Sequence, residues 1–384
     1  MNPLIDSVCA PRYVRNRFHA TGCNDSPGSD LRLMPRTRPR STSVTMADVA
    51  RRAGVSKSSV SRAINRVPGG VAPAVAERVQ KAVEELGYVP NAIAASLANR
   101  RTRTVGLILP DLGNPFFALV AAGIEDAIRA AGFTLLVANT SNDHARETAV
   151  TRTLLERQVD ALLIASCGPG DEHLRLAIDR GVHVVLVDTH PQEVTTDCVC
   201  ADNGRGAAEA VQHLLALGHT DIGVITGLLA NDSSAAERLA GVRATLAGAG
   251  IELRPDRWVS GDYEAGSGDI GARTLFEGAD RPTALFVTNN LMTLGALRAI
   301  AALGLSVPGD VSVVGFDDMD WYPLVDPPVT AVAQPAFEIG ARAAERLLER
   351  VERGRELQPE TIRLPTRLIV RASTAPPVRR GGMH

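Results

Sequence analysis

Apolar and polar residues between positions 44 and 65 alternate with the period of two short helices joined by a tight turn. Thr45 and Asp48 have the spacing of a capping box, which begins the first helix, and Gly54 suits the left-handed position that ends it. Such a helix pair fits the major groove of DNA, although a plain helical hairpin with a solvated face has the same pattern. The outward face of the second helix carries Lys57, Ser58, Ser59, Arg62 and Asn65.

A third amphipathic stretch starts at Pro73, a residue favoured in the first turn of a helix, and stops at Gly87. We expect it to pack on the helix pair and to complete a three-helix domain over residues 44–90. The Ala-rich segment 92–98 predicts one more helix, which is too short to be stable alone in water. It is followed by a basic linker that ends at residue 103.

From Thr104 onward, strand-like apolar runs alternate with amphipathic helical stretches. This alternation predicts parallel sheets covered by helices on both faces, and some 270 residues of it indicate two sheets rather than one. The fold class is therefore α/β after the N-terminal helices. The strand-like runs are residues 105–109, 134–138, 161–165, 182–187, 222–226, 284–288 and 311–315. The helical stretches include residues 116–131, 146–156, 205–217, 234–249, 265–276 and 291–303.

Polar side chains gather directly after these strand-like runs. Ligands of doubly wound sheets bind beyond the carboxyl ends of the strands, so these positions are candidates for a binding site. They are Asp111, Asn114, residues 141–143, Ser166, Asp188, Asn289, Asn290, Asp317 and Asp318.

The charge of the 384-residue chain is unevenly distributed. Residues 1–40 carry seven Arg against three Asp, and residues 41–103 carry ten basic and four acidic residues, so the remainder has a net charge of −12 in a chain whose total is −2. A basic N-terminal module on an acidic body fits nucleic-acid binding at one end.

Residues 1–43 are rich in Pro, Arg, Ser and Asn and show no periodicity, so we expect a disordered basic extension. Two explanations remain open. The segment is either an arm that adds nonspecific DNA affinity or the result of a start codon placed too far upstream, with Met34 as the alternative start.

The five cysteines are odd in number and lie in no CxxC pattern, which argues against a disulfide framework or a zinc site and for a reducing compartment. Cys198 and Cys200 flank one residue of a probable strand, so both thiols share a face, and ordinary burial is expected for them. No apolar run is long enough for a membrane span, and the N-terminus lacks a signal-peptide pattern. We therefore expect a cytoplasmic protein.

Enzymatic function is not expected. No GxGxxG motif, P-loop, GxSxG elbow or His/Cys ligand cluster follows a strand-like run, so the sequence predicts no catalytic residue, no metal site and no cofactor. A solute-binding protein for transport is the other alternative, and the missing signal peptide and the N-terminal helix pair disfavour it.

Several segments, in order along residues 44–373, resemble the lactose-repressor (LacI/GalR) family of bacterial transcription regulators. They are residues 44–65, 86–91 (LGYVPN), 105–117 (VGLILPDLGNPFF), 213–219 (HLLALGH), 238–241 (RLAG), 313–318 (VVGFDD) and 327–330 (PPVT).

The resemblance implies a helix-turn-helix headpiece at 44–90, a hinge helix and linker at 91–103, and a two-lobed effector-binding and dimerisation body of periplasmic-binding-protein type at 104–373. Its N-lobe would comprise about 104–201 and 334–364, and its C-lobe about 202–330 and 365–373. The tail 374–384 lacks the apolar heptads of a tetramerising coil, so a homodimer on a near-palindromic operator is expected. The chain would cross between the lobes near residues 201–203, 330–334 and 363–366.

By position in the family motif, the recognition helix begins at Lys57 and reads bases, with Arg62 suited to a guanine edge. Phosphate contacts are expected from Thr45, Ser59 and Asn65. Ala94 and Leu97 match residues that enter the minor groove, with Leu97 as a wedge at a central base step and a packing role between paired hinge helices as the alternative for Leu97. The implied DNA-binding residues are Thr45, Lys57, Ser58, Ser59, Arg62, Asn65, Ala94 and Leu97.

The resemblance also implies an effector in the cleft between the lobes, bound around Arg238, whose guanidinium suits vicinal hydroxyls or a carboxylate. A sugar or related polyol is the default effector of a repressor of this kind, and a phosphorylated sugar, a purine or control by a partner protein are the alternatives. Asn290 departs from the family, where Asp is usual. The implied effector-binding residues are Asp111, Asn114, Phe116, Ser166, Arg238, Tyr263, Asn289 and Asp317.

Overall fold

The computed structural model describes residues 44–64, 69–89, 102–229, 233–354 and 357–378. It divides into two units, Met1–Pro90 and Asn91–His384, which are considered separately. The predicted extension 1–43, Asn65, and the predicted hinge positions Ala94 and Leu97 lie outside the described residues.

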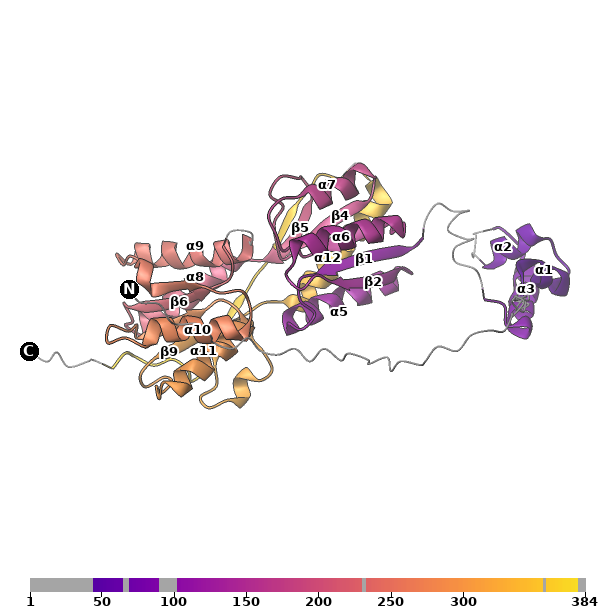
Figure 1. Ribbon diagram of the computed structural model, residues 1–384. Helices are drawn as coiled ribbons and strands as arrows, with labels where there is room; N and C mark the ends of the chain where they lie inside the picture. Colours follow the sequence, from indigo (N-terminus) through magenta and orange to yellow (C-terminus); the bar gives the residue numbers. More distant parts are fainter. Residues whose placement is uncertain (1–43, 65–68, 90–101, 230–232, 355–356, 379–384) are drawn as a thin grey trace, which may run out of the picture. The chain divides into compact units, whose positions relative to one another are not determined.

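The first unit is a three-helix domain of α1 (Met46–Ala53), α2 (Lys57–Ile64) and α3 (Pro73–Leu86) (Figure 1). The predicted capping box is present, because the Thr45 backbone N–H donates to Asp48 Oδ2 at 3.0 Å and the Asp48 N–H faces Thr45 Oγ1 at 3.4 Å. Gly54 ends α1 with a φ of 68°, the left-handed conformation that glycine adopts without a steric penalty. The buried core of this domain consists of Val49, Ala50, Ala53, Val60, Val79, Ala82 and Tyr88.

The N-terminal lobe of the second unit contains six strands: β1 (Thr104–Leu109), β2 (Thr134–Asn139), β3 (Ala161–Ile164), β4 (His183–Val187), β5 (Asp197–Ala201) and β11 (Thr361–Leu364). Its helices are α5 (Pro115–Ala130), α6 (His144–Glu156), α7 (Glu172–Asp179) and α12 (Ala336–Arg353). The strands pair in parallel in the order β11-β5-β4-β3-β1-β2. One face packs on α5 and α12, and the other packs on α6 and α7.

The C-terminal lobe also contains six strands: β6 (Ile222–Thr226), β7 (Trp258–Ser260), β8 (Ala284–Val287), β9 (Ser312–Phe316), β10 (Thr330–Ala333) and β12 (Arg367–Ile369). Its helices are α8 (Asn203–Ala216), α9 (Ser233–Gly248), α10 (Ala265–Phe276) and α11 (Asn290–Ala302). The strand order is β12-β10-β9-β8-β6-β7, and β12 pairs antiparallel with β10 while the other described strands of this sheet pair in parallel. Helices α8 and α9 cover one face, and α10 and α11 cover the other.

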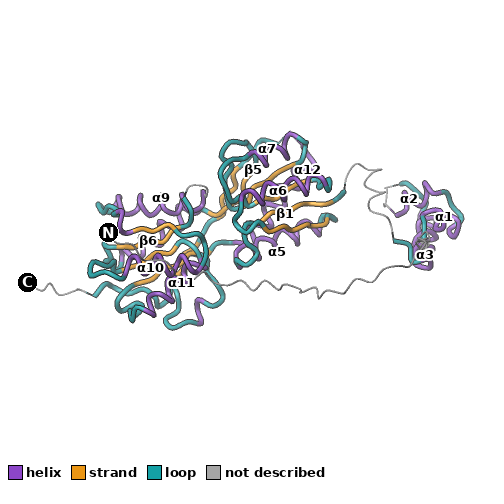
Figure 2. The backbone as a smooth tube through the Cα atoms, in the orientation of Figure 1, coloured by secondary structure: helices purple, strands orange, loops and turns teal. Residues whose placement is uncertain are grey.

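The two predicted sheets are thus confirmed, each with helices on both faces (Figure 2). The chain passes from one sheet to the other between β5 and α8, between β10 and α12, and between β11 and β12. Because β10 belongs to the C-terminal lobe as far as Ala333, that lobe extends three residues beyond the expected 330.

Helices α7 and α12 are additional to the predicted ones, and so are the short strands β7, β10, β11 and β12. Each of these strands has only three or four residues, and β11 alternates exposed with half-buried residues, so none forms a conspicuous apolar run. Within the described ranges, every helix is too short or too polar to cross a lipid bilayer.

Candidate functional site

The surface of α2 presents the side chains that were predicted to read DNA. Lys57, Ser58 and Arg62 are exposed and Ser59 is half-buried, whereas Val60 is fully buried against the headpiece core. Ser56 caps this helix, because its Oγ accepts the Ser59 backbone N–H at 3.1 Å. The cap and the buried valine hold the helix in place with its polar face outward.

The hydroxyl groups near this surface are already engaged with neighbours. Ser56 Oγ lies 2.8 Å from Ser58 Oγ and 2.9 Å from Ser59 Oγ. Thr45 Oγ1 donates to Asp48 Oδ2 at 2.7 Å. Lys57 and Arg62 are therefore the two long cationic side chains of α2 that extend beyond this local network.

In the second unit, a cavity of about 250 Å³ is lined by residues of both lobes. All eight residues that the resemblance assigned to an effector line it: Asp111, Asn114, Phe116, Ser166, Arg238, Tyr263, Asn289 and Asp317. Except for Arg238, which lies in the second turn of α9, they come from the carboxyl ends of strands or the helix starts that follow. The carboxyl edges of both sheets therefore border the cavity.

Arg238 lies on α9, and its side chain is held by contacts within the C-terminal lobe. Its Nε donates to Asn203 Oδ1 at 2.8 Å, and NH1 donates to the Thr288 carbonyl at 2.7 Å. The guanidinium also lies over the Phe316 ring, 3.9 Å from its centre. These contacts orient the group before any ligand arrives, and within the described residues NH2 makes no hydrogen bond.

Asp317 directly follows β9, adopts the left-handed conformation with a φ of 68°, and is almost completely buried. Burial raises the pKa of this carboxyl group, against the attraction of the Arg238 guanidinium. Its oxygens accept hydrogen bonds from the side chains of Asn290 and Gln334, and Oδ2 also accepts the Asn290 backbone N–H at 3.4 Å. The carboxyl group therefore joins the start of α11 to the segment after β10 at the wall of the cavity.

Two predicted residues cap helices at the cavity. Asn114 Oδ1 accepts the Phe116 N–H at the start of α5, and Asn289 Oδ1 accepts the Leu291 and Met292 N–H groups at the start of α11. Asn114 Oδ1 also accepts from Asn290 Nδ2 at 2.9 Å, which joins the two lobes.

Aromatic rings form part of the cavity wall. Phe116 is buried, with its ring edge-on to Phe117 at a centroid distance of 5.1 Å. Tyr263 has a φ of 69°, unusual for a bulky residue, and its ring lies against Gly227. A Cβ at position 227 would be 2.1 Å from the Tyr263 ring, so glycine is needed for this ring position.

Ser166 is less available to a ligand than the other predicted residues. Its hydroxyl donates to Glu147 Oε1 at 2.7 Å, and Glu147 is fully buried. The cavity also includes Asn142 and Asp188, which the strand-end rule had already proposed. It further includes polar residues that no prediction named: His144, Cys167, Thr189, Ser234 and Gln334. Several follow strands, so the strand-end rule would have found them; His144 and Ser234 lie instead in helices and carried no such signal.

Comparisons with known proteins agree with this architecture. A family model described as "Bacterial regulatory proteins, lacI family" matches residues 45–91, and one described as "Periplasmic binding protein-like domain" matches residues 211–374. The HTH-type transcriptional repressor PurR of Aliivibrio salmonicida (strain LFI1238) is 36% identical over 326 residues, covering 83% of this chain and 97% of the relative.

Two solved structures are similar over 86% of this chain and 99% of their own. The lac repressor dimer bound to operator and the anti-inducer ONPF has a TM-score of 0.77 and 30% identity. A complex of the transcriptional regulator CelR with cellobiose has a TM-score of 0.66 and 34% identity. The chain therefore belongs to the lacI family of bacterial regulatory proteins and is a DNA-binding transcription regulator, not an enzyme.

Proposed function

We propose that this regulator is a repressor whose affinity for operator DNA is set by a sugar or related polyol bound between its lobes. The observation that carries the proposal is the cavity in which a preoriented cation, a buried carboxyl group and aromatic rings meet. Arg238 and Asp317 come from the C-terminal lobe, and Asp111 and Phe116 come from the N-terminal lobe.

This combination suits a polyhydroxylated ligand. A guanidinium donates to two neighbouring oxygens at once, and a carboxylate accepts from hydroxyl groups. Phe116 and Tyr263 add apolar ring surface. The volume of about 250 Å³ lies just below the usual range for ligand pockets, about 300–1,000 Å³, which favours a small sugar. The cellobiose named for the CelR complex is a ligand of this chemical class.

Ligand control would act through the contact between lobes. The Asn114–Asn290 hydrogen bond spans the two lobes at 2.9 Å, so it would break if the lobes moved apart. A ligand that touches both lobes binds the closed and open arrangements with different affinities, and it shifts their populations only by that difference.

On the DNA side, we assign base reading to Lys57, Ser58 and Arg62, and phosphate contacts to Thr45, Ser59 and Asn65. Ala94 and Leu97 would enter the minor groove from the 91–103 segment. The exposed polar face of α2 supports the first assignment. A homodimer would place two such headpieces on a near-palindromic operator, and the similar lac repressor binds its operator as a dimer.

The cavity is tested by a thermal-shift screen of sugars and polyols with the full chain, followed by operator-binding assays with each compound that binds. The operator itself is first selected from random duplexes. Arg238→Ala should retain operator affinity and lose the response to the effector. Arg243→Ala is the matched control, because Arg243 is exposed on the same helix and does not line the cavity.

A normal effector response in Arg238→Ala would show that the effector binds elsewhere. Loss of the response in both arginine variants would point to a general effect on α9 and not to this cavity. For the DNA side, Leu97→Ala should weaken operator binding far more than nonspecific binding, and an equal loss for both would contradict the minor-groove assignment.

A further inference from the structure

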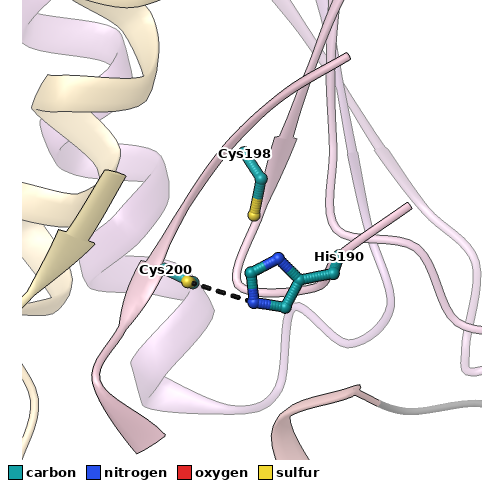
Figure 3. A group of neighbouring side chains, drawn as sticks. All are labelled: His190, Cys198 and Cys200. Carbon is teal, nitrogen blue, oxygen red and sulfur yellow. Dashed lines mark hydrogen bonds between the residues drawn. The ribbon is translucent and has the colours of Figure 1, made fainter. Parts of the chain in front are cut away.

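Three metal-ligating side chains meet beside β5 in the N-terminal lobe. Cys198 and Cys200 lie two residues apart on this strand, and both sulfur atoms face the imidazole of His190, which comes from the segment after β4 (Figure 3). The donor atoms of the three side chains all lie within 4.8 Å of one another. None of the three residues lines the interlobe cavity.

The distance between the Cys200 sulfur and the His190 Nε2 atom matches that of two ligands on one metal ion. With a Zn–S bond of about 2.3 Å, a Zn–N bond of about 2.0 Å and a tetrahedral angle, the sulfur and nitrogen ligands stand about 3.5 Å apart. The observed distance from Cys200 Sγ to His190 Nε2 is 3.5 Å. An ion would therefore need little rearrangement of this pair.

We propose that His190, Cys198 and Cys200 bind a thiophilic divalent cation of the Zn²⁺ class. Two thiolates with one imidazole form a soft donor set, which selects zinc and similar transition metals over Mg²⁺ or Ca²⁺. The fourth position is left to water or to Glu237, whose Oε1 lies 3.1 Å from the same imidazole nitrogen.

The positive charge of a neighbouring arginine would repel a bound cation, but a carboxylate partly neutralises this charge. Arg363 NH1 lies 4.0 Å from Cys200 Sγ, and NH2 lies 3.2 Å from His190 Nε2, so this guanidinium would have to withdraw from the imidazole when a metal binds. The same guanidinium donates to both oxygens of Glu237, at 3.0 and 2.7 Å, so its charge is largely balanced by that carboxylate. Two thiolates then supply the negative charge that a divalent cation requires.

An ion can reach the site from the side of His190. The His190 side chain is 19% exposed, whereas both cysteines are completely buried. Glu237 belongs to α9 of the C-terminal lobe, and His190 belongs to the N-terminal lobe. A metal on His190 Nε2 would replace the present contacts of this nitrogen with Glu237 and Arg363, and the loss of the Glu237 contact would alter one link between the lobes.

Sequence spacing alone disfavours such a site, because the cysteines do not form a CxxC pair. Only the folded chain adds the third ligand, since the loop after β4 returns His190 to the face of β5 on which the two thiols lie.

The test uses the full chain with Cys9→Ser and Cys23→Ser, which leaves Cys167, Cys198 and Cys200 as the thiols. Reduced, metal-free protein is titrated with Co²⁺ and then with Zn²⁺. We expect one equivalent of Co²⁺ to produce a thiolate-to-cobalt charge-transfer band in the near ultraviolet, which Zn²⁺ then abolishes. His190→Gln should weaken Co²⁺ binding by about tenfold or more, the scale on which changes around a bound metal act.

Cys167→Ser is the matched control. Cys167 is the one thiol of this variant outside the proposed donor set, so its replacement should leave the charge-transfer band unchanged. Cys198→Ala and Cys200→Ala should each remove most of the band, with circular dichroism to verify folding. If the buried cysteine variants do not fold, His190→Gln decides the question. The proposal is overturned by absence of a thiolate band, by unchanged Co²⁺ affinity in His190→Gln, or by loss of the band in Cys167→Ser.

Discussion

Asn290 at the start of α11 donates its side-chain amide to Asn114 Oδ1 at 2.9 Å, across 176 residues of sequence and from one lobe to the other. The same amide nitrogen lies 3.1 Å from Asp317 Oδ2. One neutral side chain thus links the two lobes and also donates a hydrogen bond to a buried carboxyl group. An ionised aspartate at this position would supply neither donor.

Asn290→Asp should destabilise the body by about 1–3 kcal/mol, because it leaves buried polar atoms without a donor. It also places a second carboxyl group beside Asp317, whose pKa burial already raises. When a carboxyl group has a higher pKa in the folded than in the unfolded state, the folded protein becomes less stable as the pH rises. The difference in unfolding free energy between wild type and Asn290→Asp should therefore grow from pH 5 to pH 8. Thermal unfolding midpoints across this range measure it. Asn142→Asp, at an exposed position, is the control, and an equal pH trend in both variants would rule out this explanation.

Arg62→Ala should lower operator affinity by about 1–3 kcal/mol and relax the preference at one base pair in each half-site. Arg62 is exposed on α2, where no other arginine is present. Fluorescence anisotropy with the selected operator and its single-base variants measures both effects. Arg78→Ala removes the same charge from an exposed position on α3 and should leave the base preference intact. If Arg62→Ala weakens binding to random DNA as much as to operator, the residue contacts phosphates only.

Glu147→Gln should lose less stability than the wild-type protein when the pH is lowered. Burial raises the pKa of Glu147, but its contact with His173 at 2.6 Å and the hydrogen bonds from Cys167 and Ser166 outweigh burial, so the pKa lies below its usual 4.5. A depressed pKa stabilises the fold above the unfolded-state pKa, and this stabilisation is lost as the pH falls.

At pH 7 the same Glu147→Gln variant should be less stable by about 1–3 kcal/mol. Thermal midpoints between pH 4 and pH 8 test both expectations. Glu172→Gln, at an exposed position on the neighbouring α7, should follow the wild-type curve. Parallel curves for wild type and Glu147→Gln would show that the buried carboxylate does not govern acid stability.

Gly340→Ala should destabilise the N-terminal lobe by about 1–3 kcal/mol through overpacking. A Cβ at Gly340 would lie 2.0 Å from the Val120 carbonyl oxygen, and one at Gly123 would lie 2.1 Å from the Phe337 carbonyl oxygen, so α5 and α12 approach each other through these glycines. Gly266→Ala in α10 has no atom within 4 Å of its Cβ and should instead stabilise by about 0.5–1 kcal/mol. Denaturant midpoints of the two variants should therefore move in opposite directions.

The spacing of neighbouring residues was sufficient to predict the helices and strands that have a strong apolar or capping pattern. The capping box of Thr45 and Asp48, the left-handed Gly54 and the alternation of apolar runs with amphipathic helices are properties of neighbouring residues, and the structure contains them. Strands β11 and β12 were not predictable in this way. They are short, and they become strands because each pairs with a neighbour, β5 or β10, that is distant in sequence.

The sequence by itself determined the helix-turn-helix, the two α/β sheets and the polar residues at strand ends, because each of these depends on periodicity over a few residues. Only the tertiary structure decided how those residues are used. Asn114 caps α5 and also accepts a hydrogen bond from Asn290 of the other lobe. The Ser166 hydroxyl donates to buried Glu147. His190 lies beside two cysteines and completes a set of three possible metal ligands. These contacts depend on strand pairing and on how the lobes meet, and residues so far apart in the chain carry no spacing that reveals them.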